Sequence, residues 1–280
     1  MPKSFSDVVT DAVADMTEHG FDDAERLERW ISRIRKALER QMASPAQMER
    51  KLREALIAIY KRMIDNGGIE RQHPGVPRFT IEKVKPHLRA ELERRIMASA
   101  ELIRLNRETV IGKVIRRFVG WASSVPKGGS ETVNKRETKG DIRKALTQLP
   151  FEERRVLIDQ SHKLTASLSE IIAKDGGALA GIWHSHWRQT GYAYRPDHKD
   201  RDLRVYTVRG NWALVKRLMR VGKDGYYDAI TGVGEEPFCR CYMEWIYTLS
   251  ALPAEMLTQK GKDELERVRG LMRADEQEYA

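Results

Sequence analysis

The sequence predicts an α+β protein in which a helical N-terminal region precedes a small domain of helices and short strands, closed by a Cys-Arg-Cys segment. Three observations support this fold class. Apolar residues recur at helical spacing through most of the first 175 residues. A polar, Gly/Ser-rich stretch without periodicity covers residues 123–140. Beyond Gly177 the segments shorten, period-two patterns appear, and four of the six tryptophans follow: Trp183, Trp187, Trp212 and Trp245.

Three helices are expected in the first 66 residues. The first covers residues 4–19 and stops at a glycine, and the second begins near residue 22 with an apolar stripe on one face. The third begins at Ser44-Pro45-Ala46-Gln47, whose serine can cap the helix while its glutamine reaches back and its proline fits the first helical position. We expect these three helices to pack together.

A loop and a long amphipathic helical region follow. Glycines and prolines mark residues 67–79 as a connection. Thr80 is expected to cap a helical region that is interrupted, or begins again, at Pro86 and extends to about Val119.

The domain boundary is predicted in the polar stretch. This divides the chain into a helical region at residues 1–122, a flexible linker at 123–140 and a C-terminal domain at 141–280. Helices are expected at residues 141–149 and from Pro150 to about residue 174, where a glycine pair ends the run.

Short strands and one more helix complete the C-terminal domain. Alternating apolar and polar residues predict strands within 203–208 and 242–249. Helical spacing returns at 264–272. We expect a small sheet that packs on the preceding helices through its tryptophans.

Composition narrows the class of protein. Hydrophobic residues make up 41% and charged residues 32%, which is typical of a soluble, charge-rich, helix-rich chain. No apolar run approaches the roughly 18–20 residues of a membrane span, and the first residues lack a secretory signal, so we expect a protein made in a cytoplasm and no membrane partner. The net charge of +9 favours contact with polyanions such as DNA, bound without sequence specificity.

The two cysteines, Cys239 and Cys241, are spaced so that both thiols face the same side of an extended segment. Two thiolates can share a zinc ion at about 2.3 Å each, with His198 and either His184 or His186 completing the tetrahedron. We take Cys239, Cys241, His198 and His184 as the candidate set for a structural zinc. The alternative is a pair of buried free thiols, and no other cofactor is expected.

A second interpretation starts from His184-Ser185-His186. Two histidines and Asp197 could bind a catalytic zinc with an open water position, with Glu170 as a general base. The run resembles the His-x-His segment of JAMM-type metalloproteases. It departs from that family at Trp187, where the family has a proline, and at Tyr194, where the family has a serine. A zinc-dependent hydrolase of this type is the alternative function.

A different resemblance covers about a quarter of the chain. A tryptophan-containing strand, an Arg-x-x-His element and a terminal Pro-x-Cys-Arg-Cys resemble the C-terminal domain of phage head-morphogenesis proteins, the minor head proteins of the phage Mu F type. The residues that carry it are Trp183, Arg195, His198, Pro237, Cys239, Arg240 and Cys241. Histidines at 184 and 186 depart from that pattern.

The resemblance implies a virion component and not a catalyst, so no catalytic residue is assigned. Such proteins associate with the portal region and with capsid or scaffold proteins, and assist head assembly and DNA packaging or delivery. The implied location is the virion head, with the host cytoplasm during assembly.

Overall fold

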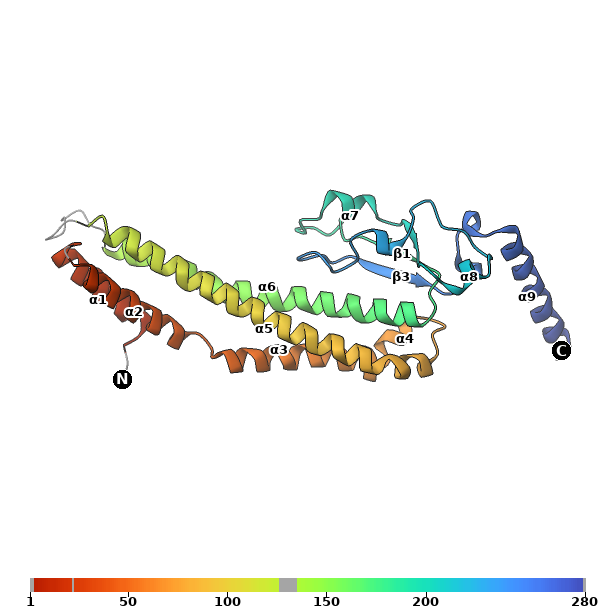
Figure 1. Cartoon of the computed structure of the whole chain (residues 1–280), viewed down its shortest axis with the longest axis horizontal. Helices are drawn as coiled ribbons and strands as arrows, with labels where there is room; N and C mark the ends of the chain where they lie inside the picture. Colours follow the sequence, from red (N-terminus) through yellow and green to blue (C-terminus); the bar gives the residue numbers. More distant parts are fainter. Residues whose placement is uncertain (1–2, 22, 126–134, 279–280) are drawn as a thin grey trace. The chain divides into compact units, whose positions relative to one another are not determined.

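The computed structural model describes residues 3–21, 23–125 and 135–278 and confirms an α+β fold. Long helices dominate the N-terminal part, and a three-stranded antiparallel sheet follows (Figure 1). The chain divides into two compact units, Met1–Ala55 with Ile96–Ile158, and Leu56–Arg95 with Asp159–Ala280.

These units differ from the predicted division at the polar stretch. Two long helices, α5 (Arg78–Ala122) and α6 (Lys135–Asp175), each contribute one half to one unit and one half to the other. The structural boundaries therefore fall inside helices that show no break in sequence pattern. Residues 135–140 of the expected linker are the first turns of α6, and residues 126–134 lie outside the described residues.

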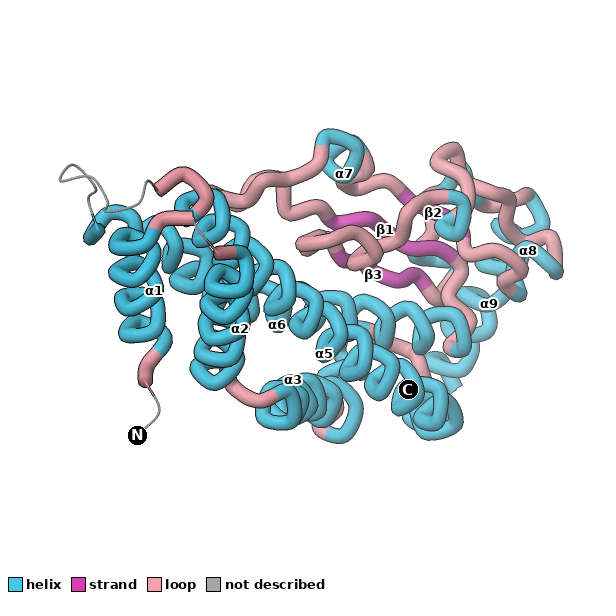
Figure 2. Tube along the Cα trace, turned by 60° about the vertical axis from the view of Figure 1, so that its left-hand side comes forward, coloured by secondary structure: helices cyan, strands magenta, loops and turns pink. Residues whose placement is uncertain are grey.

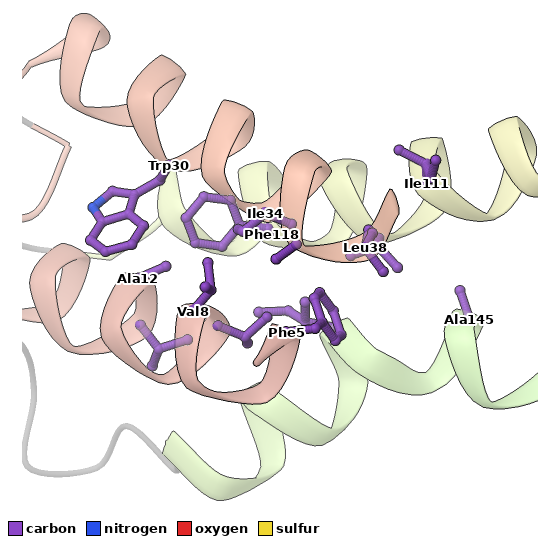
Figure 3. Close-up of a cluster of buried hydrophobic side chains, with 14 of the residues drawn as sticks. Phe5, Val8, Ala12, Trp30, Ile34, Leu38, Ile111, Phe118 and Ala145 are labelled. Carbon is purple, nitrogen blue, oxygen red and sulfur yellow. The ribbon is translucent and has the colours of Figure 1, made fainter. Parts of the chain in front are cut away.

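The first unit is built around α1 (Phe5–His19) and α2 (Ala24–Gln41). Ser4 and Asp7 form a reciprocal capping box at the start of α1, which satisfies backbone N–H groups that a helix end leaves unpaired. The apolar stripes of both helices meet the second half of α5 and the first half of α6 in one core (Figure 3). Labelled members of this core are Phe5, Val8, Ala12, Trp30, Ile34, Leu38, Ile111, Phe118 and Ala145.

The third helix, α3 (Pro45–Tyr60), begins where predicted. The Gln47 amide donates to the Ser44 hydroxyl at 3.2 Å, and the Ser44 amide donates back to the Gln47 side chain at 3.1 Å, so the capping box is confirmed. The expectation that α3 packs with α1 and α2 needs correction. Its Leu52 instead packs in a separate cluster with Ile103 of α5 and Val156 of α6.

The expected loop at residues 67–79 holds more helix than its composition predicts. A π-helical turn, η1 (Lys61–Asp65), continues α3, and α4 (Gly68–Gln72) lies inside the expected loop. Thr80 is not a cap, because α5 has already begun at Arg78.

Two prolines lie inside helices instead of at their starts. Pro86 is inside α5 and Pro150 is inside α6. A proline removes one backbone hydrogen bond and disfavours helix. Around Pro86 the buried Val84 and Leu88 continue the apolar stripe, so side-chain packing keeps the helix continuous.

The sheet of the second unit has the strand order β2-β1-β3 (Figure 2). The strands are β1 (Ala180–His184), β2 (Val205–Thr207) and β3 (Tyr242–Ile246), so both predicted strand regions are confirmed over shorter spans. Gly181 in the central strand lies opposite Tyr206 on one side and Trp245 on the other.

Strand alternation places different side chains on the two faces of the sheet. One face carries Trp183, Tyr206, Met243 and Trp245, which pack with Ala173 of α6. In Figures 1 and 2 the second half of α6 runs along the sheet. The other face contributes residues such as Ala180 and Ile246 to a core that includes α8 (Trp212–Val215). The remaining elements are α7 (Pro196–Asp200), η2 (Tyr227–Ala229), η3 (Leu249–Ala251), η4 (Ala254–Met256) and α9 (Gln259–Glu278).

A close backbone contact at the start of α9 leads to a prediction. A Cβ at Gly261 would lie 2.0 Å from the carbonyl oxygen of Leu218, so Gly261→Ala forces α9 away from that loop. We expect the free energy required to open the first turns of α9, measured by amide hydrogen exchange, to fall by about 1–3 kcal/mol.

Gly270→Ala is the matched control in the same helix. A Cβ at Gly270 meets no atom within 4 Å, so alanine is expected to stabilise α9 by about 0.5–1 kcal/mol. Equal protection in Gly261→Ala and the unmodified chain would contradict the close contact.

Candidate metal centre

One group of potential metal ligands is assembled within residues 3–21, 23–125 and 135–278. His198, Cys239 and Cys241 place their ligand atoms within 4.8 Å of one another, and we call them the His-Cys-Cys group. All three side chains are buried, with His198 and Cys239 each only 1% exposed. Both cysteines are free thiols.

Two short segments position the group. His198 is the third residue of α7, a five-residue helix whose first position is the proline of Arg195-Pro196, a residue suited to a helix start. Cys239 and Cys241 lie on the segment that leads into β3. The ring of Trp183, at the end of β1, packs edge-on against the His198 imidazole with 5.4 Å between centroids.

The Nδ1 atom of His198 faces both sulfurs. It lies 3.6 Å from Cys239 Sγ and 3.5 Å from Cys241 Sγ. The two thiols therefore point to one side, as their spacing predicts. An imidazole nitrogen has a single lone pair or a single proton, so it can form a good hydrogen bond with only one of two equidistant sulfurs.

The other ring nitrogen faces a carboxylate. Nε2 of His198 lies 3.1 Å from Oε2 of Glu236. Arg195 pairs with the same oxygen through Nε at 2.7 Å, and its Nη2 donates to the Pro237 carbonyl at 2.9 Å. The Arg-x-x-His element and the Pro-x-Cys-Arg-Cys element are thus joined through Glu236.

Backbone hydrogen bonds fix the cysteine segment. Phe238 has a positive φ of 61°, a left-handed conformation that costs energy for a residue with a Cβ. Its amide donates to the buried carboxylate of Asp159 on α6. The Tyr192 hydroxyl donates to the Phe238 carbonyl and accepts from the Arg240 amide, each at 3.2 Å. The thiols are therefore positioned by several contacts outside the cysteines themselves.

The Cys241 thiol donates a hydrogen bond to the Cys239 sulfur. A hydrogen bond with the Cys241 thiol lowers the pKa of Cys239 to about 5, with further hydrogen bonds from the backbone amides of Gly234 and Cys241, while burial opposes this shift. The pKa of Cys241 is raised because it donates to Cys239 and is buried. Of the two sulfurs, Cys239 is therefore the one that ionises first.

His184 does not join the His-Cys-Cys group, which corrects the predicted ligand set. Its Nε2 pairs with Glu244 Oε2 at 2.9 Å, and its ring stacks on Tyr242 with 4.8 Å between centroids. Successive residues of a strand point to opposite faces. Because Trp183 faces His198, the next residue of β1 faces the other way.

The residues proposed for a JAMM-like hydrolase form no metal-ligand group within the part of the chain that the structure describes. His184 pairs with Glu244, whereas the Asp197 carboxylate pairs with Arg201 at 3.0 Å. The ring of His186 lies 6.0 Å from that of Tyr242. Glu170, the proposed base, pairs with Lys174 one turn along α6 at 2.6 Å.

Arg240 lies between the cysteines and points elsewhere. Its guanidinium lies 5.4 Å above the Tyr192 ring, and its Nη1 is 3.5 Å from the Gln189 side chain. Both of these partners are neutral. Asp202, an acidic residue of the same domain, accepts from the Ser185 amide and the Trp187 indole.

Sequence reasoning missed Glu236 as a contact of His198. The only signal was its position next to the Pro-x-Cys-Arg-Cys element, and its neighbour Glu235 carries the same charge. Local pattern does not distinguish the two carboxylates. Asp159 and Tyr192 were also missed as contacts of the cysteine segment.

Comparison with known proteins adds no family to this description: no protein-family model, curated protein or solved structure matches the chain. Among the helices of the described residues, none combines the length and apolarity that crossing a membrane requires.

Proposed function

We propose that this protein is a minor head protein of a tailed phage that associates with the portal region and assists head assembly and DNA packaging or delivery. One observation supports the proposal. Elements that carry the resemblance to phage head-morphogenesis proteins, Arg195, His198, Pro237, Cys239 and Cys241, meet in a single cluster.

The contact between these residues is informative because the Arg-x-x-His and Pro-x-Cys-Arg-Cys elements are far apart in the chain. His198 precedes Cys239 by 41 residues, yet its imidazole contacts both sulfurs. If the residues behind the family resemblance are shared because they stabilise one small domain, they are expected to contact one another. The contacts through Glu236 and the Pro237 carbonyl give these residues such a structural role, and no reaction is required of them.

Buried and exposed residues have different roles in such a protein. The buried cluster stabilises the C-terminal sheet, whereas portal, capsid or scaffold proteins would meet exposed side chains. The net charge of +9 suits a protein beside packaged DNA, because Lys and Arg offset phosphate repulsion without reading sequence. The virion head is the proposed location.

Mass spectrometry of purified virions and of DNA-free proheads tests the proposal. We expect the chain in both particles at low copy relative to the capsid protein, and crosslinked peptides that join it to the portal protein. Absence from both particles, with the chain recovered only in the soluble fraction of infected cells, would overturn it.

A further inference from the structure

We propose that the His-Cys-Cys group binds one zinc ion through His198 Nδ1, Cys239 Sγ and Cys241 Sγ, and that Glu236 orients His198 from its other ring nitrogen. This inference concerns the purified chain and does not depend on the proposed phage function. His184, predicted from sequence as a ligand, is not part of this site. Glu236 contacts the ligand His198 and does not touch the metal.

The distances match a zinc site. Zinc binds sulfur at about 2.3 Å and imidazole nitrogen at about 2.0–2.1 Å, so a tetrahedral ion places these atoms about 3.5 Å apart. The measured separations from Nδ1 are 3.5 and 3.6 Å. A single hydrogen bond would bring one sulfur closer than the other, whereas one shared metal ion accounts for both distances.

The ligand chemistry favours the same ion. Two thiolates and one imidazole, all in a buried site, form a soft, nitrogen- and sulfur-containing set that suits zinc and disfavours magnesium or calcium. No third cysteine or carboxylate belongs to the group in the part of the chain described here, so three protein ligands leave one coordination position for water.

The second ring nitrogen of His198 faces a carboxylate. Metal-bound histidines usually present the second ring N–H to a carboxylate, which fixes the tautomer and the ring orientation. Here the Nε2 atom of His198 and the Oε2 atom of Glu236 are buried and 3.1 Å apart, an ion-pair distance at which neither atom completes an aligned hydrogen bond within the described residues. Arg195 holds the carboxylate in place at 2.7 Å.

One residue of the His-Cys-Cys group borders a cavity. Cys241 lines a cavity of about 470 Å³ together with His186 and Arg240. Bound metal would connect α7 to the segment before β3, so its binding free energy would also stabilise the fold of this region.

Metal analysis of the purified full-length chain tests the site. We expect one zinc per chain by inductively coupled plasma mass spectrometry, loss of at least nine-tenths of it in His198→Ala, and no loss in the matched control His184→Ala. A zinc-free wild-type chain that takes up no zinc on titration would overturn the proposal. So would equal zinc content in the two histidine variants.

Cobalt spectroscopy of the wild-type chain keeps the test independent of misfolded variants. Co²⁺ loaded in place of zinc should give sulfur-to-cobalt charge-transfer absorption and the intense visible bands of a tetrahedral site. Six-coordinate bands without the charge-transfer absorption would contradict coordination by the two thiolates.

Glu236→Gln tests the positioning role. Removing a supporting carboxylate typically lowers metal affinity by about 10–100-fold, and we expect that range here in competition with a chromogenic chelator. Glu235→Gln is the matched control and should bind zinc like the wild type. The visible cobalt bands should shift in Glu236→Gln and return in Glu236→Asp. Unchanged affinity and unchanged bands in Glu236→Gln would overturn this role.

Discussion

Replacing Trp183 by alanine is expected to lower the free energy that opens the sheet by about 3–5 kcal/mol, the usual cost of removing a fully buried aromatic side chain. Trp183 is 0% exposed. Its ring packs edge-on against His198 and Tyr206, and the Arg201 guanidinium lies 5.1 Å from its centre. The substitution therefore opens a cavity between β1, β2 and α7.

Amide hydrogen exchange of β1 and β3 measures this effect in the full chain. Trp212→Ala is the matched control, because that tryptophan is 40% exposed and less of its surface is removed from water. We expect the control to change the same opening free energy by well under half as much. Equal effects of the two substitutions would show that Trp183 is not central to the sheet.

Acidification is expected to destabilise the second unit through His73. The imidazole is buried between the Tyr247 hydroxyl and the Ser169 hydroxyl, which lies 3.1 Å from Nε2. Burial lowers the pKa of His73 from 6.5 to about 4. Between these pH values the unfolded chain binds a proton that the folded imidazole does not, so stability is complete above pH 6.5 and falls as the pH approaches 4. The loss is about 3 kcal/mol.

Comparison of variants isolates this contribution. His73→Gln keeps a polar side chain but does not titrate, so its opening free energy should depend less on pH between 6.5 and 4 than that of the wild type. Ser169→Ala removes a hydrogen-bond partner of both His73 and the Trp245 indole and keeps the imidazole, so we expect a loss of about 1–3 kcal/mol at every pH and an unchanged slope. Identical slopes in wild type and His73→Gln would exclude His73 as the source.

Local patterns predict much of the secondary structure because their causes are local. The Ser44 capping box and the strand ending at Ile246 depend on residues within a few positions of one another. The same patterns mislead at Pro86 and Pro150, where helix continues because buried neighbours outweigh one lost backbone hydrogen bond. The two compact units differ from the predicted division for a similar reason, since α5 and α6 each contribute to both units without a change of sequence pattern.

The candidate metal centre shows where sequence reasoning stops. Cys239 and Cys241 face one side because their spacing matches the period of an extended chain, and this follows from sequence alone. Which histidine faces the two thiols does not follow from sequence alone. His198 faces the thiols while His184 faces away, because strand pairing places Trp183 toward α7 and turns the next residue to the opposite face.

From its own residues, then, the chain specifies an α+β protein with long helices, a short-stranded C-terminal sheet and two thiols on one side of the final strand segment. Only the tertiary structure brings Arg195 into contact with Glu236, and Glu236 into contact with the histidine that faces those thiols, His198. The physical reason is that His198 and Cys239 are 41 positions apart, and no periodicity relates side chains across that distance. Their contact depends on how α7 and β3 pack against β1.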